Sequence, residues 1–508
     1  MIVLLMSAAV LGGAAALARW LRTSQREHYH PWQATTAARR WTTRRPPNAA
    51  LVATWVLLAG CSVATSGWIS SVAALTGLAV GAVFPVGMPL LGRPRLRLTR
   101  RAIYQGSWAA ALAASTAAAL GLFLGLRGAT ALLPGVVLIA VDCAAVLNLP
   151  IERRIARGFR RQAEDKLTKV NPRVVAITGS YGKTTVKNHV RDLLSPSMTV
   201  LATPASWNNE AGLSRAINEQ LTPGIEVFVA EMGTYGPGEL EALVSWVHPE
   251  VAVITAIGPV HLERMGTLEN IVRVKSEIVD GARSAVICID YPLLAALADD
   301  LERTNRVKEL WRVGTADHAD VSVSPDASGD QFSVTVRGSE IAMLDQTGVH
   351  PSNVACAVAA ACALGVDTSM VARALKKLQP VDSRATVAAT EDGVVVVDDT
   401  FNSNPDGAEA ALRRLCCAVA GGRRVVVTPG MVELGPAQFK ANERFARSVA
   451  ESGCELVIVG WTNRAALRRG HSGAIVVPNR DRARQWVRVH LRPGDGVLWE
   501  NDLPDHYP

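Results

Sequence analysis

A glycine-rich loop is the clearest site for chemistry in this sequence. The apolar run 174–178 predicts a buried strand, and a helix is expected from Val186. The loop between them reads Gly179-Ser180-Tyr181-Gly182-Lys183-Thr184-Thr185. In this context backbone N–H groups and a helix N-terminus can cradle phosphate, and Lys183 can reach the outer phosphates. A hydroxyl of Thr184 or Thr185 can bind Mg²⁺, so the loop predicts a nucleotide site.

Two more side chains are expected at the same edge of the predicted sheet. Glu231 closes the apolar run 226–230, and His261 follows the run 251–257. Ligands of open α/β folds bind at the carboxyl ends of the strands. An acid and an imidazole there suit a divalent ion held beside phosphates. We therefore predict a metal site formed by Thr184, Glu231 and His261.

The elements that must position these residues form two predicted domains. From residue 174, short apolar runs alternate with amphipathic segments, which predicts a parallel sheet with crossover helices. Three later runs alternate apolar with polar residues and predict a small antiparallel addition, at 321–323, 332–336 and 341–344. A second α/β domain is expected from about 381, with strands at 394–397, 424–427, 455–459, 474–477 and 496–499.

The N-terminal third is different, because it carries five apolar stretches at about 2–18, 49–66, 69–91, 107–125 and 129–149. Such stretches can cross a hydrocarbon layer of about 30 Å. Arginine-rich connections alternate with arginine-poor ones, and arginine-rich loops stay in the cytoplasm. The pattern predicts a multi-pass inner-membrane protein with its N-terminus outside and its polar part cytoplasmic. A signal peptide at 1–18 fits less well, because no positive region precedes it.

The charges are divided between the two parts. Residues 1–172 hold 20 basic and 5 acidic residues, and the remainder holds 33 basic and 40 acidic ones. The excess of positive charge lies in the apolar N-terminal third, so the net charge of +8 does not predict a nucleic-acid partner. The expected partner is the lipid bilayer. Asp142, inside the last apolar stretch, either bonds a neighbouring helix or marks a transport path, and the helix bond is favoured. The eight cysteines form no C-x-x-C pair and predict no zinc site.

Together these residues resemble the Mur ligase family of ATP-dependent amide-forming enzymes. Residues 178–185 look like the ATP loop of that family, and Glu231 and His261 sit where it places Mg²⁺ ligands. The segment Trp207-Asn208-Asn209-Glu210-Ala211-Gly212 resembles its N-N-x-x-G substrate segment, which implies substrate contacts at Asn208 and Asn209. Lys275 matches the lysine that the family carbamylates to make a further metal ligand.

Later motifs extend the resemblance to about residue 460. The run 398–405, D-D-T-F-N-S-N-P, is close to a D-D-S-Y-N-A-N-P motif. That motif is most typical of the branch that adds D-alanyl-D-alanine to the muramoyl tripeptide. Residues 430–435 resemble its G-D-M-x-E-L-G segment. The resemblance implies that Asp399 contacts the ribose, Arg384 the phosphates and Asn353 the adenine. It also implies that Asn402 and Asn404 contact the substrate.

Three departures from that branch stand out. Membrane helices replace the domain that binds the UDP-sugar peptide. The segment 348–353 is one residue short of the usual H-x-x-x-N spacing. The run 499–505, W-E-N-D-L-P-D, stands where the branch usually has K-G-S-R. These differences predict a substrate pocket that is not the standard one.

The expected fold is an α-helical membrane domain (1–150), a basic linker (151–173), a central α/β P-loop ATPase domain (174–380) and a C-terminal Rossmann-like α/β domain (381–508). The resemblance implies a membrane-anchored ligase of cell-wall (peptidoglycan) or other envelope peptide synthesis, which uses ATP and Mg²⁺. It would join an acid, as an acyl phosphate, to an amine, with Lys183, His261, Lys275 and Arg384 as catalytic residues. Substrates on the membrane and other envelope-synthesis membrane proteins are expected partners. The alternatives are a capsule-type polymer ligase, such as a poly-γ-glutamate synthase, and a transport ATPase.

Overall fold

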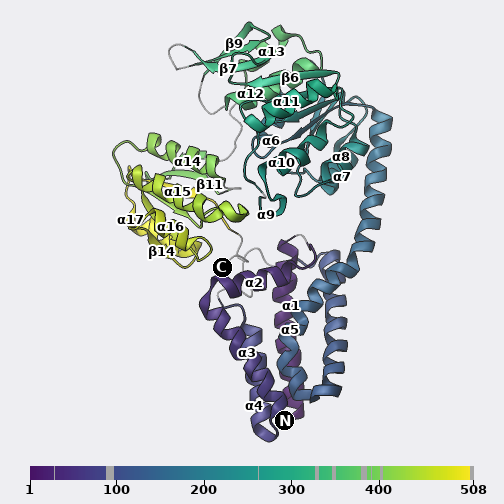
Figure 1. Cartoon of the computed structure of the whole chain (residues 1–508), viewed down its shortest axis with the longest axis vertical. Coiled ribbons are helices and arrows are strands. Elements are labelled where there is room, and N and C mark those ends of the chain that lie inside the picture. Colours follow the sequence, from purple (N-terminus) through teal and green to yellow (C-terminus); the bar gives the residue numbers. More distant parts are fainter. Residues whose placement is uncertain are drawn as a thin grey trace.

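The computed structural model describes residues 1–27, 29–86, 88, 96–260, 262–326, 331–345, 350–378, 386–390, 392–400 and 404–503. Figure 1 shows an elongated helical region at the N-terminal end and two α/β domains beyond it. The helical region consists of α1 (Ile2–Arg26), α2 (Gln33–Arg44), α3 (Pro46–Ala64), α4 (Gly67–Val83) and α5 (Arg100–Val170).

A helix lies in each of the five apolar stretches of the sequence, although α4 ends at Val83, before the predicted end of its stretch. Helix α5 holds two of them, because Gly125 leaves the helical conformation with φ of +70° and divides α5 into two arms. Among the described residues, three helices, α1, α3 and α5, are by length and composition able to cross a membrane, whereas α4 is shorter. The predicted linker is not a separate element, because α5 continues through it as far as Val170.

Asp142 is fully buried in α5, where it holds the start of α2. Its carboxylate accepts hydrogen bonds from the backbone N–H groups of Ala34 and Thr35, at 3.2 and 2.9 Å, and from the Thr35 hydroxyl. The first N–H groups of a helix have no partner within the helix, so an acid there stabilises it. The interpretation of Asp142 as a bond to a neighbouring helix is confirmed.

The central domain is built on a nine-stranded sheet in the order β2-β3-β1-β4-β5-β6-β7-β8-β9. Strands β1 to β7 pair in parallel, while β8 and β9 are antiparallel. The strands are β1 (Arg173–Thr178), β2 (Val200–Ala202), β3 (Val227–Glu231), β4 (Val251–Ile254), β5 (Ser284–Cys288), β6 (Glu309–Gly314), β7 (Val321–Pro325), β8 (Gln331–Val336) and β9 (Ser339–Asp345). The predicted antiparallel addition therefore extends the main sheet.

Helices pack around this sheet and bury its apolar strands in one core. Strands buried on both faces explain the nearly continuous apolar runs of the sequence. The helices are α6 (Lys183–Leu194), α7 (Glu210–Gln220), α8 (Glu239–Val247), α9 (Leu262–Met265), α10 (Leu268–Ser276), the short η1 (Glu277–Val279), α11 (Pro292–Thr304), α12 (Pro351–Ala363) and α13 (Thr368–Leu375).

The C-terminal domain has a six-stranded sheet in the order β10-β11-β15-β12-β13-β14, parallel except for β10. Its strands are β10 (Thr386–Ala389), β11 (Val395–Asp399), β12 (Arg424–Thr428), β13 (Glu455–Val459), β14 (Ile475–Val477) and β15 (Gly496–Glu500). Its helices are α14 (Pro405–Ala418), η2 (Gly435–Ala437), α15 (Gln438–Glu451), α16 (Arg464–Gly470) and α17 (Arg480–His490). The expected central and C-terminal α/β architecture is confirmed.

Candidate active site

The glycine-rich loop joins β1 to α6, as its sequence predicts. Two of its glycines have no room for a side chain. A Cβ at Gly179 would lie 2.0 Å from the Thr255 hydroxyl oxygen, and one at Gly182 would lie 2.4 Å from Asn353 Oδ1. Gly182 also has φ of +78°, a conformation that favours glycine. The loop is thus held tightly at the N-terminus of α6, where backbone N–H groups can receive phosphate.

Lys183 is the first residue of α6, and its ammonium group contacts the preceding loop. Its Nζ donates a hydrogen bond to the Gly179 carbonyl oxygen at 2.7 Å. Asn353, near the start of α12, lies against the same loop at Gly182. The fold therefore brings together the predicted phosphate-binding lysine and the predicted adenine contact.

Glu231, at the end of β3, is the centre of a buried polar network. The Thr184 hydroxyl and the Lys187 ammonium both donate to its Oε2, at 2.9 and 3.2 Å, and Asn208 Nδ2 donates to its Oε1 at 3.0 Å. Two predicted metal ligands, Thr184 and Glu231, are therefore in direct contact. A hydroxyl and a carboxylate beside a phosphate loop fit Mg²⁺, which prefers oxygen ligands.

Lys187 is a site residue that the sequence analysis missed. It lies one helical turn after Lys183, and its side chain is only 2% exposed. Besides Glu231 it bonds the Ala205 carbonyl oxygen at 2.6 Å, so it joins α6 to the loop that carries Asn208. Burial lowers the pKa of Lys187, and the Glu231 carboxylate opposes that shift. Its i+4 spacing from Lys183 is the signal that could have revealed it.

Lys275, near the end of α10, is buried and only 4% exposed. Burial lowers its pKa well below the ordinary value, and the nearby Lys183 lowers it further. In the part of the chain that the structure describes, no carboxylate forms an ion pair with it. A neutral buried amine can react with CO₂ to give a carbamate, which would turn an unfavourable cation into an anionic ligand. The carbamate remains a prediction that the environment of Lys275 favours.

Other predicted residues have structural roles or lie outside the described residues. Asn209 caps α7 through Gly212 N–H, and Asn404 caps α14 through Gly407 N–H. Asp399 ends β11 and is buried. Three predicted site residues lie outside the described residues: His261, Arg384 and Asn402.

The C-terminal domain approaches the loop through the start of α14. Tyr181, in the loop, is half-buried, and its buried hydroxyl has no hydrogen-bond partner in the described part of the chain. Burial raises the pKa of Tyr181, and Asp406 of α14 raises it further. A hollow between the domains is lined by Pro259 on one side and by Pro405 and Asp406 on the other. The two domains thus meet beside the phosphate loop.

Glu500, at the end of β15, is a second residue that the sequence analysis did not assign. It is fully buried, and its Oε1 has no partner among the described residues. Burial raises the pKa of Glu500 to about 8, the Thr428 hydroxyl bond lowers it, and Asp399 raises it. The Thr428 hydroxyl bonds Glu500 and accepts from Gly430 N–H at 2.7 Å. Residues 499–502, part of the run that differs from the resembled branch, therefore support the loop at residues 430–435.

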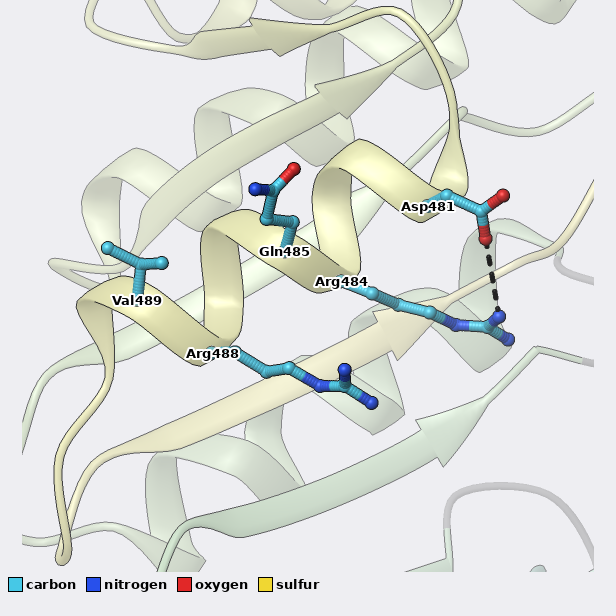
Figure 2. Close-up of a pocket in the computed structure, with 5 residues that line it drawn as sticks. All are labelled: Asp481, Arg484, Gln485, Arg488 and Val489. Atoms are coloured by element: carbon cyan, nitrogen blue, oxygen red, sulfur yellow. Dashed lines mark ion pairs between the residues drawn. The ribbon is translucent and has the colours of Figure 1, made fainter.

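A surface depression lies far from this chemistry, along α17 (Figure 2). Asp481, Arg484, Gln485, Arg488 and Val489 share one face of the helix there. Their spacing of three and four residues explains the shared face. The depression contains none of the predicted site residues, so the site is assigned from the phosphate loop.

Comparison with known proteins identifies the family. Residues 177–364 match the Mur ligase middle domain, and residues 383–500 match the family described as "Mur ligase, glutamate ligase domain". A UDP-N-acetylmuramoyl-tripeptide–D-alanyl-D-alanine ligase of Mycobacterium leprae is 31% identical, over 64% of this chain and 70% of its own length. The chain belongs to the Mur ligase family. It is accordingly an ATP-dependent, ADP-forming ligase.

Solved structures agree with this Mur ligase assignment. A MurF ligase from Thermotoga maritima in complex with ADP is 25% identical and has a TM-score of 0.55, covering 68% of this chain and 80% of its own. A MurF structure from Acinetobacter baumannii, at 23% identity, shares the fold, with a TM-score of 0.58 over 68% of this chain and 77% of its own. The helical region before residue 177 lies outside both family matches.

Proposed function

We propose that this Mur ligase is anchored in the membrane and joins an acid to an amine during cell-wall or other envelope peptide synthesis. The observation that carries the proposal is the network around Glu231, which sets a hydroxyl, a carboxylate and the phosphate loop side by side. Carboxylate is a poor electrophile, so the acid must be activated. Phosphorylation by ATP gives an acyl phosphate, which the amine attacks as phosphate leaves.

The residues of this chain have distinct tasks in that reaction. Lys183 and the loop N–H groups would bind and orient the transferred phosphate, which matters because phosphoryl transfer depends mainly on positioning and charge neutralisation. Thr184, Glu231 and a carbamylated Lys275 would hold Mg²⁺, which supplies that neutralisation when bound. Asn208, bonded to Glu231, would place the acid beside the metal.

Two departures support a substrate pair different from that of the relatives. The relatives are named for a UDP-N-acetylmuramoyl tripeptide and D-alanyl-D-alanine. The apolar helices before residue 177 lie outside both family matches. The resemblance would place K-G-S-R near the end of the chain, where Glu500 and its neighbours read W-E-N-D. We infer an envelope peptide as the product class, with an acid that is presented at the membrane.

Turnover with candidate acids and amines tests the ligase proposal. The full-length protein with ATP and Mg²⁺ should release phosphate only when both an acid and an amine are present. Lys183→Ala should lower the rate about 10²–10³-fold, because a charged contact to the transition state is lost. Lys377→Ala, at an exposed lysine of the same domain, serves as the control and should change nothing. Phosphate release that does not depend on the amine would instead favour a transport ATPase.

Reporter fusions test the anchor. Arginine-rich connections on one side support a topology with the N-terminus outside and both α/β domains in the cytoplasm. A reporter after Arg173 should be cytoplasmic, and one at Ser66 should be external. The opposite labelling would refute the five-span topology. Asp142 was the main sequence feature in favour of a transport ATPase. In the structure its carboxylate instead accepts hydrogen bonds from the start of α2.

A further inference from the structure

One stretch of α5 joins the helical region to the central domain, and we call residues 147–161 the neck. Figure 1 shows α5 rising from the bundle along one side of the molecule to the central domain. At 1.5 Å per residue the neck is about 20 Å long. Nearly all of its side chains from residue 151 onward are exposed or only partly buried, so it is a bridge with accessible faces.

A row of large apolar side chains runs along the neck. Leu147, Ile151, Ile155 and Phe159 are spaced four residues apart and are 46%, 48%, 57% and 54% exposed. Residues four apart are neighbours on a helix surface, so these side chains form one continuous ridge. Single exposed apolar residues are ordinary, but a contiguous row indicates a binding surface. Its lower end, Leu147, belongs to the last apolar stretch, so the row continues from the proposed membrane span.

A second row on the neck is positively charged. Arg154, Arg157 and Arg161 are spaced three and four residues apart and are exposed. Arg154, three residues after Ile151, is a neighbour of the apolar row, and the two later arginines lie farther round the helix. The only acid between residues 147 and 161 is Glu152, which is paired with Arg101 at 2.5 Å. The neck therefore combines an apolar ridge with excess positive charge.

The upper end of the neck touches the predicted substrate segment. Asn218 of α7 donates from Nδ2 to the Phe159 carbonyl oxygen at 3.0 Å. Arg160 lies 3.9 Å from the carboxylate of Glu210, the first residue of α7. Two residues earlier, Asn208 bonds Glu231 in the candidate active site. The ridge thus leads from the proposed membrane span to the residues that would hold the acid.

We propose that the acid substrate is carried on an anionic lipid, whose chain lies along the apolar row and whose phosphate pairs with the arginine row at its Arg154 end. This rests on the proposed ligase function. An apolar peptide would match the ridge but not the arginines, and a free phosphate compound would match the arginines but not the ridge. An anionic lipid matches both and reaches the neck from the bilayer. Its headgroup would then present the carboxylate to the segment 207–212.

Trapping of the acyl phosphate tests this proposal even while the acid is unidentified. The full-length protein in lipid nanodiscs receives ATP, Mg²⁺ and hydroxylamine, with either a lipid extract of bacterial membranes or the water-soluble fraction of the same cells. Hydroxylamine nitrogen attacks the acyl carbon, phosphate leaves, and a hydroxamate remains on the acid. We expect the hydroxamate on a lipid-soluble molecule. A hydroxamate found only on water-soluble acids would overturn the lipid proposal and keep the ligase. No hydroxamate from either fraction would overturn the ligase proposal itself.

Variants of the neck separate a substrate surface from simple contact with the bilayer. Ile151→Ser, Ile155→Ser and Phe159→Ser combined should lower lipid hydroxamate formation at least about tenfold at limiting extract, with ATP binding and melting temperature unchanged. Val489→Ser, at an exposed apolar residue on α17, should have no effect. Equal activity of the triple variant and wild type would refute the proposal.

A cross-linking experiment gives a second reading that does not depend on turnover. A photoreactive p-benzoylphenylalanine at position 155 should capture the lipid that carries the acid. It should also lose that adduct when Arg154 and Arg157 are changed to Gln. Capture of bulk phospholipid alone would show that the neck merely touches headgroups, and would contradict the proposal.

Discussion

Replacement of Lys187 by methionine tests the network that organises the site. Lys187→Met keeps the length of the side chain but removes its charge, which leaves the Glu231 carboxylate buried without its cation. Removing one partner of a buried ion pair typically costs about 3–5 kcal/mol. Thr184 and Asn208 still donate to Glu231, so we expect the lower end, about 3 kcal/mol. The Ala205 carbonyl also loses its hydrogen bond, so the true cost should not be smaller.

The assay is thermal unfolding of the full-length, nucleotide-free protein, followed by tryptophan fluorescence. For a domain of this size about 3 kcal/mol corresponds to a fall of roughly 6–12 °C in the central-domain transition. Lys377→Met, at an exposed lysine, is the control. The double variant Lys187→Met, Glu231→Gln removes the unpaired charge and should recover most of the loss.

Two results would refute this reasoning. One is a melting temperature of Lys187→Met within about 2 °C of wild type, since the effect expected for a buried pair is several-fold larger. The other is a double variant that loses the sum of the two single losses. Additive losses would mean that Lys187 and Glu231 act independently.

Two further predictions concern Lys275 and Glu500. Lys275→Ala should abolish turnover while ATP still binds, and short carboxylates should partly restore activity by replacing the carbamate; rescue by amines instead would contradict that role. For Glu500, the folded state keeps a proton up to about pH 8, whereas the unfolded chain releases it near pH 4.5. Stability of the C-terminal domain should therefore fall as pH rises between these values, and Glu500→Gln should flatten this dependence in melting curves. An unchanged pH dependence in the variant would contradict the raised pKa.

The sequence predicted those parts of the fold and site whose signals are local. The phosphate loop lies between a buried strand and a helix, and Glu231 follows a buried strand directly, so both could be placed from neighbouring residues. The expected strands of both sheets were found for the same reason. Three strands, β2, β6 and β10, were not predicted. In β6, Arg312 interrupts the apolar pattern, and the structure shows this arginine paired with Asp299 and Glu302.

Other features depend on contacts between residues that are far apart in the sequence, so the pattern of neighbouring residues could not predict them. The role of Asp142 requires Thr35, which is 107 positions away in the chain. The burial of Lys187 depends on Ala205, on a loop that the local helix pattern does not reveal. The continuity of α5 was hidden because Pro150 suggests a break, whereas the helix continues through it. Asn209 and Asn404 cap helices α7 and α14, a role that their motifs did not predict, and their substrate contacts stay predictions.

Transfer of oxygen from the acid to phosphate tests the ligase mechanism most directly. The acid fraction that supports turnover is labelled with ¹⁸O in its carboxylates and given to the full-length protein with ATP, Mg²⁺ and the amine. If an acyl phosphate forms, one carboxylate oxygen stays on phosphorus when the amine attacks. We predict one ¹⁸O in each released phosphate. Released phosphate without ¹⁸O would contradict activation of the acid at the Glu231 site.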